Sequence, residues 1–161
     1  MDRVRISLVE LALLTAAAAL VLVLLLQRGG PTRPAVVRAS WARTPGVLNP
    51  DVTQTTIRST ICVAGWTRTV RPPVSYTNRL KGLQLVQYGL RGARSDFQED
   101  HLISLELGGS PTDERNLWPE PYPRAAEVDR IENQLNHDVC TGALTLAQAQ
   151  RKESAMKHRD G

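Results

Sequence analysis

The sequence predicts an α+β domain that follows one long apolar helix. Three observations support this fold class. Residues 6–26 are almost continuously apolar. Short runs rich in Thr, Ile, Val and Leu, typical of strands, occur between residues 52 and 107. Helical spacing or helix-capping signals recur in three segments, which are residues 78–88, 124–139 and 145–155.

The apolar run at the N-terminus is interrupted only by Ser7, Glu10 and Thr15. About twenty such residues are enough to cross a bilayer as a helix. No small-x-small cleavage site follows the run. We therefore expect residues 1–27 to be an uncleaved signal anchor that places one transmembrane helix in the membrane. A helix buried in a soluble protein is the alternative.

Two signals in the sequence disagree about the side of the membrane on which the domain lies. More arginines follow the apolar run than precede it, which by the positive-inside rule favours the cytoplasm. Two cysteines behind an export-like segment, Cys62 and Cys140, instead indicate one disulfide that closes a long loop. Without Cys-x-x-Cys spacing, metal ligation by these cysteines is the weaker alternative. We favour a membrane-anchored or secreted domain outside the cytoplasm, in the cell envelope.

The segment after the apolar run predicts a linker and then the first elements of a domain. Residues 28–48 are rich in Gly, Pro and Arg without periodicity, which predicts a flexible linker. Residues 52–70 favour short strands around the first cysteine. The Arg-Pro-Pro sequence at 71–73 ends them. A Ser or Thr then caps a helix over residues 78–88, which two nearby glycines end.

The second half of the domain is expected to alternate strand, turn and helix. Leucine and isoleucine in residues 97–107 fit a strand, and Gly-Gly-Ser-Pro follows it as a turn. Residues 113–120 form an irregular loop or a short second strand. Apolar residues at helical spacing predict a helix over 124–139, with a final helix over 145–155. The domain therefore covers residues 49–155, and residues 156–161, with His158, form a disordered tail.

The charge distribution suggests two functional halves. The net charge is +4, but the charges are unevenly distributed. Residues 31–94 contain ten Arg or Lys and one acid, whereas residues 95–161 contain thirteen acids and seven bases. This asymmetry suits an enzyme that binds a polyanion with one half and a cation with the other. A solvated basic surface explains the charge balance equally well.

The most informative motif is Asp100-His101, with Asn116 fifteen positions after the histidine. A carboxylate can hold a hard divalent cation while a neutral imidazole beside it takes a proton from water. On the helix expected at 124–139, Asp129, Asn133 and Asn136 lie toward one side, with His137 next to them. Such a face can complete a metal site, although a helix face of this kind is more often simply solvated.

Five ordered blocks in residues 49–150 resemble small bacterial members of the HNH endonuclease family. The blocks are Cys62-Val-Ala-Gly-Trp-Thr67, Arg71-Pro-Pro-Val-Ser-Tyr-Thr77, Asp100 to Gly109, Asn116-Leu-Trp-Pro-Glu120 and Glu132 to Cys140. The order of strand, Gly-rich turn, loop with asparagine and polar helix is that of the ββα-metal fold. The resemblance implies this core, with extra N-terminal strands and a helix, and hydrolysis of phosphodiester bonds in nucleic acid, most simply DNA.

The resemblance also implies a role for each matching residue. His101 is similar to the general base, Asp100 to a metal ligand, and Asn116 to the residue that braces the catalytic loop. Asn133 matches a helical asparagine that can coordinate the metal. Position 136, often histidine in similar proteins, is asparagine here, and His137 lies one step further on. That step turns the imidazole by about 100° around the helix, so the resemblance supports His137 as a ligand less directly.

The cofactor and the phosphate-binding residues follow from these roles. Oxygen ligands favour Mg²⁺, with Mn²⁺ also suitable, whereas Zn²⁺ or Ni²⁺ would be favoured if His137 also coordinates. Arg94 and Arg115 are the arginines nearest to the motif in sequence and the candidates for binding the phosphate. Two alternatives to a nuclease stay open. One is a catalytically degenerate domain of the same fold that binds nucleic acid, and the other is a structural domain of the cell envelope.

Overall fold

A computed structural model describes residues 7–27 and 36–161 of the chain. The chain divides into two units, residues 1–35 and residues 36–161. In the first unit, helix α1 covers Leu8–Gln27. Over the described part of the chain, no helix combines the length and the apolar character required to cross a membrane. The membrane anchor predicted for residues 1–27 is therefore unconfirmed.

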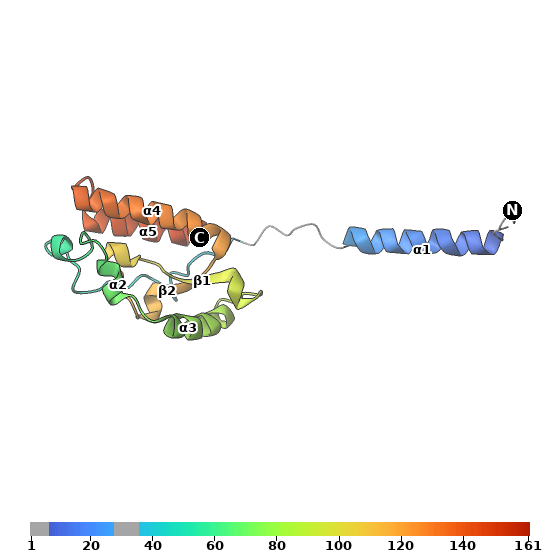
Figure 1. Cartoon of the computed structure of the whole chain (residues 1–161), viewed down its shortest axis with the longest axis horizontal. Helices are drawn as coiled ribbons and strands as arrows, with labels where there is room; N and C mark the ends of the chain where they lie inside the picture. Colours follow the sequence, from blue (N-terminus) through green and yellow to red (C-terminus); the bar gives the residue numbers. More distant parts are fainter. Residues whose placement is uncertain (1–6, 28–35) are drawn as a thin grey trace. The chain divides into compact units, whose positions relative to one another are not determined.

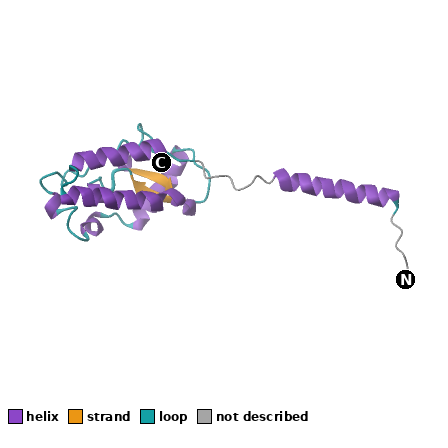
Figure 2. Cartoon of the chain, turned by 90° about the horizontal axis from the view of Figure 1, so that it is seen from above, coloured by secondary structure: helices purple, strands orange, loops and turns teal. Residues whose placement is uncertain are grey.

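The second unit is an α+β domain, as predicted from the sequence. Strands β1 (Phe97–His101) and β2 (Leu117–Pro121) pair antiparallel, with His101 opposite Leu117. Helices α4 (Tyr122–Thr141) and α5 (Leu146–Asp160) pack against each other on one side of this small sheet (Figure 1). Helix α3 (Val74–Gln87) lies on the opposite side and contacts both strands. Figure 2 shows how small the share of strand is beside the helices. The order β1, β2, α4 places one helix directly after a hairpin.

The strands predicted over residues 52–70 do not form. This segment contains a short 3₁₀ helix (Ile57–Ser59) and helix α2 (Trp66–Val70) instead. Its threonine hydroxyls bond to nearby carbonyl oxygens; Thr56 Oγ1 donates to the oxygen of Asp51 at 2.8 Å. Such local bonds offer the backbone an alternative to a strand ladder. The prediction was wrong because β-branched residues here support tight turns.

The strand predicted over residues 97–107 ends at His101. Residues Leu105–Leu107 form a 3₁₀ helix, and the apolar side chains from Leu102 to Leu107 are buried without belonging to the sheet. Gly109 closes this connection. A β-carbon at Gly109 would lie 1.7 Å from the carbonyl oxygen of Ile103, so only glycine fits there.

The core of the domain lies between α4, α5 and the segment that precedes α2. Its members are apolar residues, namely Val52, Ile57, Ile61, Ile103, Leu107, Leu135, Val139, Leu146 and Ala149. The predicted disulfide is confirmed, because Cys62 and Cys140 are bonded beside this core. The bond joins residues 78 positions apart and attaches the turn-rich segment to the end of α4.

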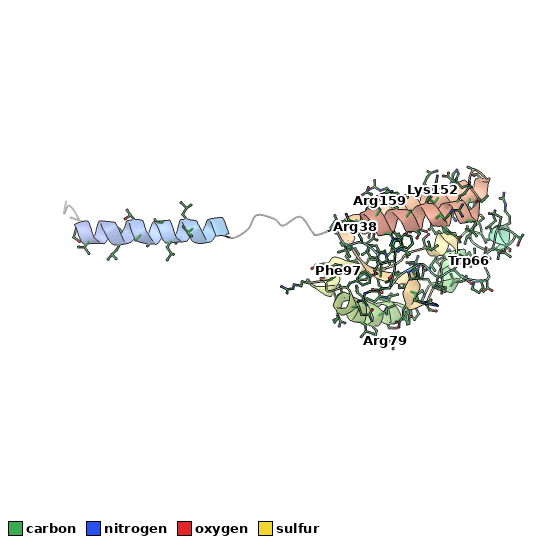
Figure 3. The ribbon with its side chains drawn as sticks, turned by 180° about the vertical axis from the view of Figure 1, so that it is seen from behind. Arg38, Trp66, Arg79, Phe97, Lys152 and Arg159 are labelled. Atoms are coloured by element: carbon green, nitrogen blue, oxygen red, sulfur yellow. A yellow bond between two sulfur atoms is a disulfide. The ribbon has the colours of Figure 1, made fainter. Side chains whose placement is uncertain are left out.

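The boundaries of the domain differ from the predicted ones at both ends. The second unit begins at Val36, so residues 36–48 belong to it and not to a linker, while residues 28–35 lie outside the described residues. Arg38 Nε donates to the oxygen of Arg159 at 2.5 Å, and Figure 3 shows these residues side by side. The expected disordered tail is the last turn of α5, where the His158 ring stacks on Trp41 at 3.5 Å. The two ends of the unit hold each other in place.

Candidate functional site

A cavity of about 260 Å³ lies between β1, the 3₁₀ helix after it, and α4. It is strongly polar. Its lining residues are Arg71, Gln98, Asp100, His101, Ser104, Leu105, Glu106, Asp129, Glu132 and Asn133. Four of them are carboxylic acids and one is an arginine, so acids outnumber bases in the lining of the cavity. Such a distribution attracts cations into the cavity.

His101 lines this cavity from the end of β1 and is largely buried. Its Nε2 lies 3.1 Å from the carbonyl oxygen of Pro111. Because a carbonyl oxygen only accepts, Nε2 carries the ring proton and Nδ1 is the basic nitrogen. Burial lowers the pKa of His101, although the charge of Asp100 acts in the opposite direction. The imidazole is therefore neutral at pH 7 and able to accept a proton.

Asn116 holds in place the loop that contains Pro111, the hydrogen-bond partner of His101. Asn116 is completely buried, and its Nδ2 donates to the oxygens of Ile103, at 3.0 Å, and Ser110, at 2.9 Å. Ser110 precedes Pro111, whose carbonyl accepts from His101. The amide of Asn116 thus positions the imidazole through the loop and not by direct contact. This arrangement agrees with the bracing role that the resemblance implies.

Asp100 is held from two sides. Its Oδ2 accepts from Lys157 Nζ at 2.9 Å, and its Oδ1 accepts from Gln98 Nε2 at 3.2 Å. Burial alone would raise the pKa of Asp100, but the charge and the hydrogen bond of Lys157 outweigh it, so the pKa is lowered. Asp100 is therefore an ionised carboxylate at neutral pH and can hold a cation.

Helix α4 supplies the opposite wall of the cavity through Asp129, Glu132 and Asn133. Asn133 Nδ2 donates to the backbone oxygen of Asp129 at 2.6 Å. With its nitrogen engaged in this way, the amide oxygen is the atom of Asn133 that can bind a metal. Glu132 is buried, and this burial raises its pKa against the opposing charge of Lys157. Asp100 and Asn133 thus line one cavity from two elements, as predicted.

His137 is not part of this cavity. It lines a second one, of about 320 Å³, next to the disulfide. Asn136, one position earlier, donates to the backbone oxygens of Ile61 at 3.2 Å and Glu106 at 2.8 Å, and so connects α4 to two loops. The polar face expected on this helix is therefore divided, since Asp129 and Asn133 face the first cavity and His137 the second. His137 therefore does not line the cavity of Asp100, and the structure gives no support to His137 as a ligand there or to Zn²⁺ or Ni²⁺.

The two arginines predicted to bind phosphate do not line the cavity either. Arg115 is paired with Asp113, with 2.7 Å between Nη2 and Oδ2. Arg94 lies against α3, where a β-carbon on Gly82 would come within 2.6 Å of its Nη2. The arginine that reaches the site is Arg71, from the turn before α3. Arg71 belongs to the Arg-Pro-Pro block of the sequence, but closeness to the motif in sequence favoured Arg94 and Arg115.

The donor set fits a hard cation that keeps part of its water shell. Among the residues that the structure describes, no three His, Cys, Asp or Glu side chains form a cluster suited to a metal ion. Mg²⁺ does not require one, because it is usually bound by one or two carboxylates and several waters. Asp100, with the amide oxygen of Asn133 and the carboxylate of Asp129 across the cavity, offers oxygen donors only. These residues fit Mg²⁺ or Mn²⁺.

Comparison with known proteins adds no relative. No protein-family model matches the chain, and no curated protein and no solved structure is detectably similar to it.

Proposed function

We propose that this domain is a metal-dependent endonuclease of the HNH type that hydrolyses phosphodiester bonds of nucleic acid. One observation carries the proposal. His101 and Asp100, at the end of β1, line a single acidic cavity together with Asp129 and Asn133 of α4. A neutral base and a set of oxygen donors around one cavity are the parts that metal-assisted phosphodiester hydrolysis requires.

Each residue of the site has its own role in the proposed hydrolysis. Asp100 and Asn133 would hold Mg²⁺, which supplies the positive charge that stabilises the phosphorane-like transition state and the leaving oxygen. His101 takes a proton at Nδ1 from the attacking water while the water oxygen bonds to phosphorus and the bond to the leaving oxygen breaks. Arg71 binds a non-bridging oxygen of the phosphate. The leaving oxygen takes up a proton from solvent to become a hydroxyl, and the imidazolium returns its proton to solvent.

The location and the substrate belong to the same proposal. The confirmed disulfide suits an oxidising compartment, which supports a domain outside the cytoplasm that is attached to the membrane by residues 1–27. Within the domain, residues 36–94 contain nine Arg or Lys and a single acid, Asp51, and this basic part suits a polyanionic substrate such as DNA.

A second function is favoured by one observation. Lys157 already binds one oxygen of Asp100, at 2.9 Å, and so satisfies part of the charge that a metal would neutralise. A domain whose site contains an internal cation could bind nucleic acid without cutting it. A purely structural domain of the cell envelope would neither bind nor cut.

Incubation of the full chain with plasmid DNA or RNA separates these functions. The nuclease predicts cleavage with Mg²⁺ or Mn²⁺ that EDTA abolishes and that His101→Ala reduces by about 100-fold or more. His137→Ala, which alters a histidine of the neighbouring cavity, is the matched control and should cut like the wild type. Binding that weakens with salt, without cleavage, would support the second function. Neither cleavage nor binding would leave only the structural one.

A further inference from the structure

Lys157 is an unusual residue because its ammonium group is completely buried. It lies in the last turn of α5 with no exposed surface. Its Nζ donates to Asp100 Oδ2 at 2.9 Å, to the backbone oxygen of His101 at 2.5 Å and to Glu132 Oε1 at 2.6 Å. An ammonium group has three N–H donors, so these three bonds use all of them. A buried lysine persists only where its charge is compensated in this way.

The acceptors of Lys157 belong to the two elements that form the proposed site. Asp100 and His101 end β1, and Glu132 precedes Asn133 on α4. One ammonium group therefore connects the strand with the proposed base and ligand to the helix with the second ligand. These are the two walls of the cavity whose separation determines whether a single cation can reach both.

Glu153, one turn before Lys157 on α5, holds a third wall of the cavity. Glu153 Oε1 lies 3.4 Å from Lys157 Nζ, and both of its carboxylate oxygens accept from the backbone nitrogen of Ser104, at 3.0 and 3.1 Å. Ser104 lines the cavity after β1. Glu153 and Lys157, four residues apart on α5, thus connect this helix to β1, to the loop after β1 and to α4.

The charges around Lys157 explain why this position needs a cation. Three carboxylic acids, Asp100, Glu132 and Glu153, lie within 4 Å of its ammonium group. Glu120 is also completely buried, and its two oxygens have no hydrogen-bond partner among the described residues. If all of these carboxylic acids were ionised, their charges would repel each other strongly away from water, and a buried cation reduces that repulsion.

We propose that Lys157 is a positioning residue of this site, an internal cation that holds Asp100 and His101 of β1 at a constant distance from Glu132 and Asn133 of α4. The inference rests on the proposed function for its effect on cleavage. Its effect on the position of β1 and α4 stands independently of that function. The bond to the backbone of His101 makes this role specific, because it acts on the residue that carries the base.

The test uses the full chain and replaces Lys157 in two ways. Lys157→Met keeps most of the length of the side chain and removes its charge. Lys157→Cys, treated with 2-bromoethylamine in denaturant without reductant and then refolded, regains an ammonium group of nearly the same length. The two natural cysteines form the disulfide, so residue 157 would be the sole free thiol. The matched control is Lys152→Met on the exposed surface of the same helix (Figure 3).

Two measurements follow the variants. Cleavage of plasmid DNA is titrated with Mg²⁺, and hydrogen exchange is measured in peptides that contain residues 98–104 and 129–133. We expect Lys157→Met to lose about 100-fold in cleavage, the loss typical of a displaced catalytic group, and to exchange faster in both peptides. The aminoethylated protein should recover in both measurements, and Lys152→Met should match the wild type. Wild-type cleavage and exchange in Lys157→Met would overturn the proposal.

Loss of a buried cation can also prevent folding, and a second variant covers this case. Glu153→Gln with Lys157→Met leaves the net charge unchanged and keeps an oxygen for the Ser104 nitrogen. If this double variant folds and both peptides exchange like the wild type, Lys157 is only a counter-ion and the proposal fails. If it does not fold, recovery of folding by aminoethylation of Lys157→Cys supports the proposal, and its absence overturns it. If the wild type cuts no nucleic acid, the proposed function fails, while hydrogen exchange still decides the role of Lys157.

Discussion

The side chain of Asn116 pairs with the backbone of Ile103 at both ends of its amide. Its Oδ1 accepts from the nitrogen of Ile103 and its Nδ2 donates to the oxygen of the same residue, both at 3.0 Å. Both residues lie in the connection from β1 to β2 and are buried, Asn116 completely. Since the same Nδ2 also holds Ser110, a single side chain determines the course of the loop from β1 to the partner of His101.

Replacing Asn116 should therefore affect stability and cleavage together. Asn116→Ala leaves the buried nitrogen and oxygen of Ile103 without partners, which costs about 3 kcal/mol of the free energy of unfolding. Asn116→Asp keeps the acceptor but loses the donor, so it should be at least as destabilising. Chemical denaturation measures the first effect, and plasmid cleavage at a temperature where the variant is folded measures the second.

The exposed Asn78→Ala on α3 is the control for this substitution, and it should change neither quantity. We expect folded Asn116→Ala to cut about 10- to 100-fold more slowly, because a misplaced base is a poor catalyst. Wild-type cleavage by a folded Asn116→Ala would contradict the role of this residue in positioning His101.

The pH dependence of cleavage should reflect the buried state of His101. Burial lowers the pKa of this imidazole, so the ring stays neutral to a lower pH than an exposed histidine, whose pKa is about 6.5. The cleavage rate should consequently be constant around pH 7 and fall only below the ordinary histidine range. Rates measured with saturating Mg²⁺ between pH 4.5 and 8 test this. An acid limb centred above about 6.5 would show that another group is the base.

Arg71 should contribute to substrate binding more than either arginine expected from the sequence. It lines the cavity, whereas Arg115 is engaged by Asp113 and lies outside it. Arg71→Ala should weaken the binding of DNA and reduce the slope of log affinity against log salt by about 1, the effect of one lost phosphate contact. Arg115→Ala should leave that slope unchanged. Equal effects of the two substitutions would show that Arg71 does not bind the phosphate at this site.

The parts of the fold that the sequence predicted correctly are those with a local physical signal. The helices predicted over residues 78–88, 124–139 and 145–155 all form, as α3, α4 and α5. Only α5 begins with a side-chain cap, from Thr145, whereas α3 and α4 each follow a proline. Asp100, His101 and Asn133 share one cavity because a strand and a helix of predictable type bring them together. The disulfide followed from two cysteines and an export-like segment.

The parts that were missed depend on tertiary contacts without a local signal. Threonines that favour strands in isolation bond to their own turns near Asp51. Lys157 belongs to a charged C-terminal sequence of the kind that is usually solvated, and only the packing of α5 behind β1 buries it. The rotation of His137 away from the cavity was foreseeable from helix geometry, but the second cavity that it lines was not.

The disulfide should contribute measurably to stability. The bond between Cys62 and Cys140 closes a loop of 78 residues, and restricting the unfolded chain in this way is worth about 2–4 kcal/mol. Reducing agent should lower the melting temperature of the wild type, and the double variant Cys62→Ser with Cys140→Ser should melt at this lower temperature in either condition. Thermal unfolding with and without reductant is the measurement. A wild type that does not respond to complete reduction would contradict this contribution.

Glu120 should make the domain less stable as the pH rises. Burial, with the nearby charge of Asp100, raises the pKa of Glu120 to about 8 in the folded protein. Unfolding returns this pKa to about 4.3. Between these two values the folded state binds the extra proton, so the contribution of Glu120 to stability is fully present below about pH 4 and is lost progressively up to about pH 8. The loss is on the order of a few kcal/mol.

The variant Glu120→Gln isolates this effect, because glutamine has a similar shape and does not ionise. Its melting temperature should resemble that of the wild type at pH 5 and exceed it at pH 8.5, where the wild type must ionise a buried carboxyl that has no hydrogen-bond partner among the described residues. Other groups also titrate in this range, His101 in the opposite direction, but they are present in both proteins and largely cancel in the difference. The exposed Glu127→Gln on α4 should produce no such difference. If Glu120→Gln follows the wild type at both pH values, the pKa of Glu120 is not raised by burial in the folded domain.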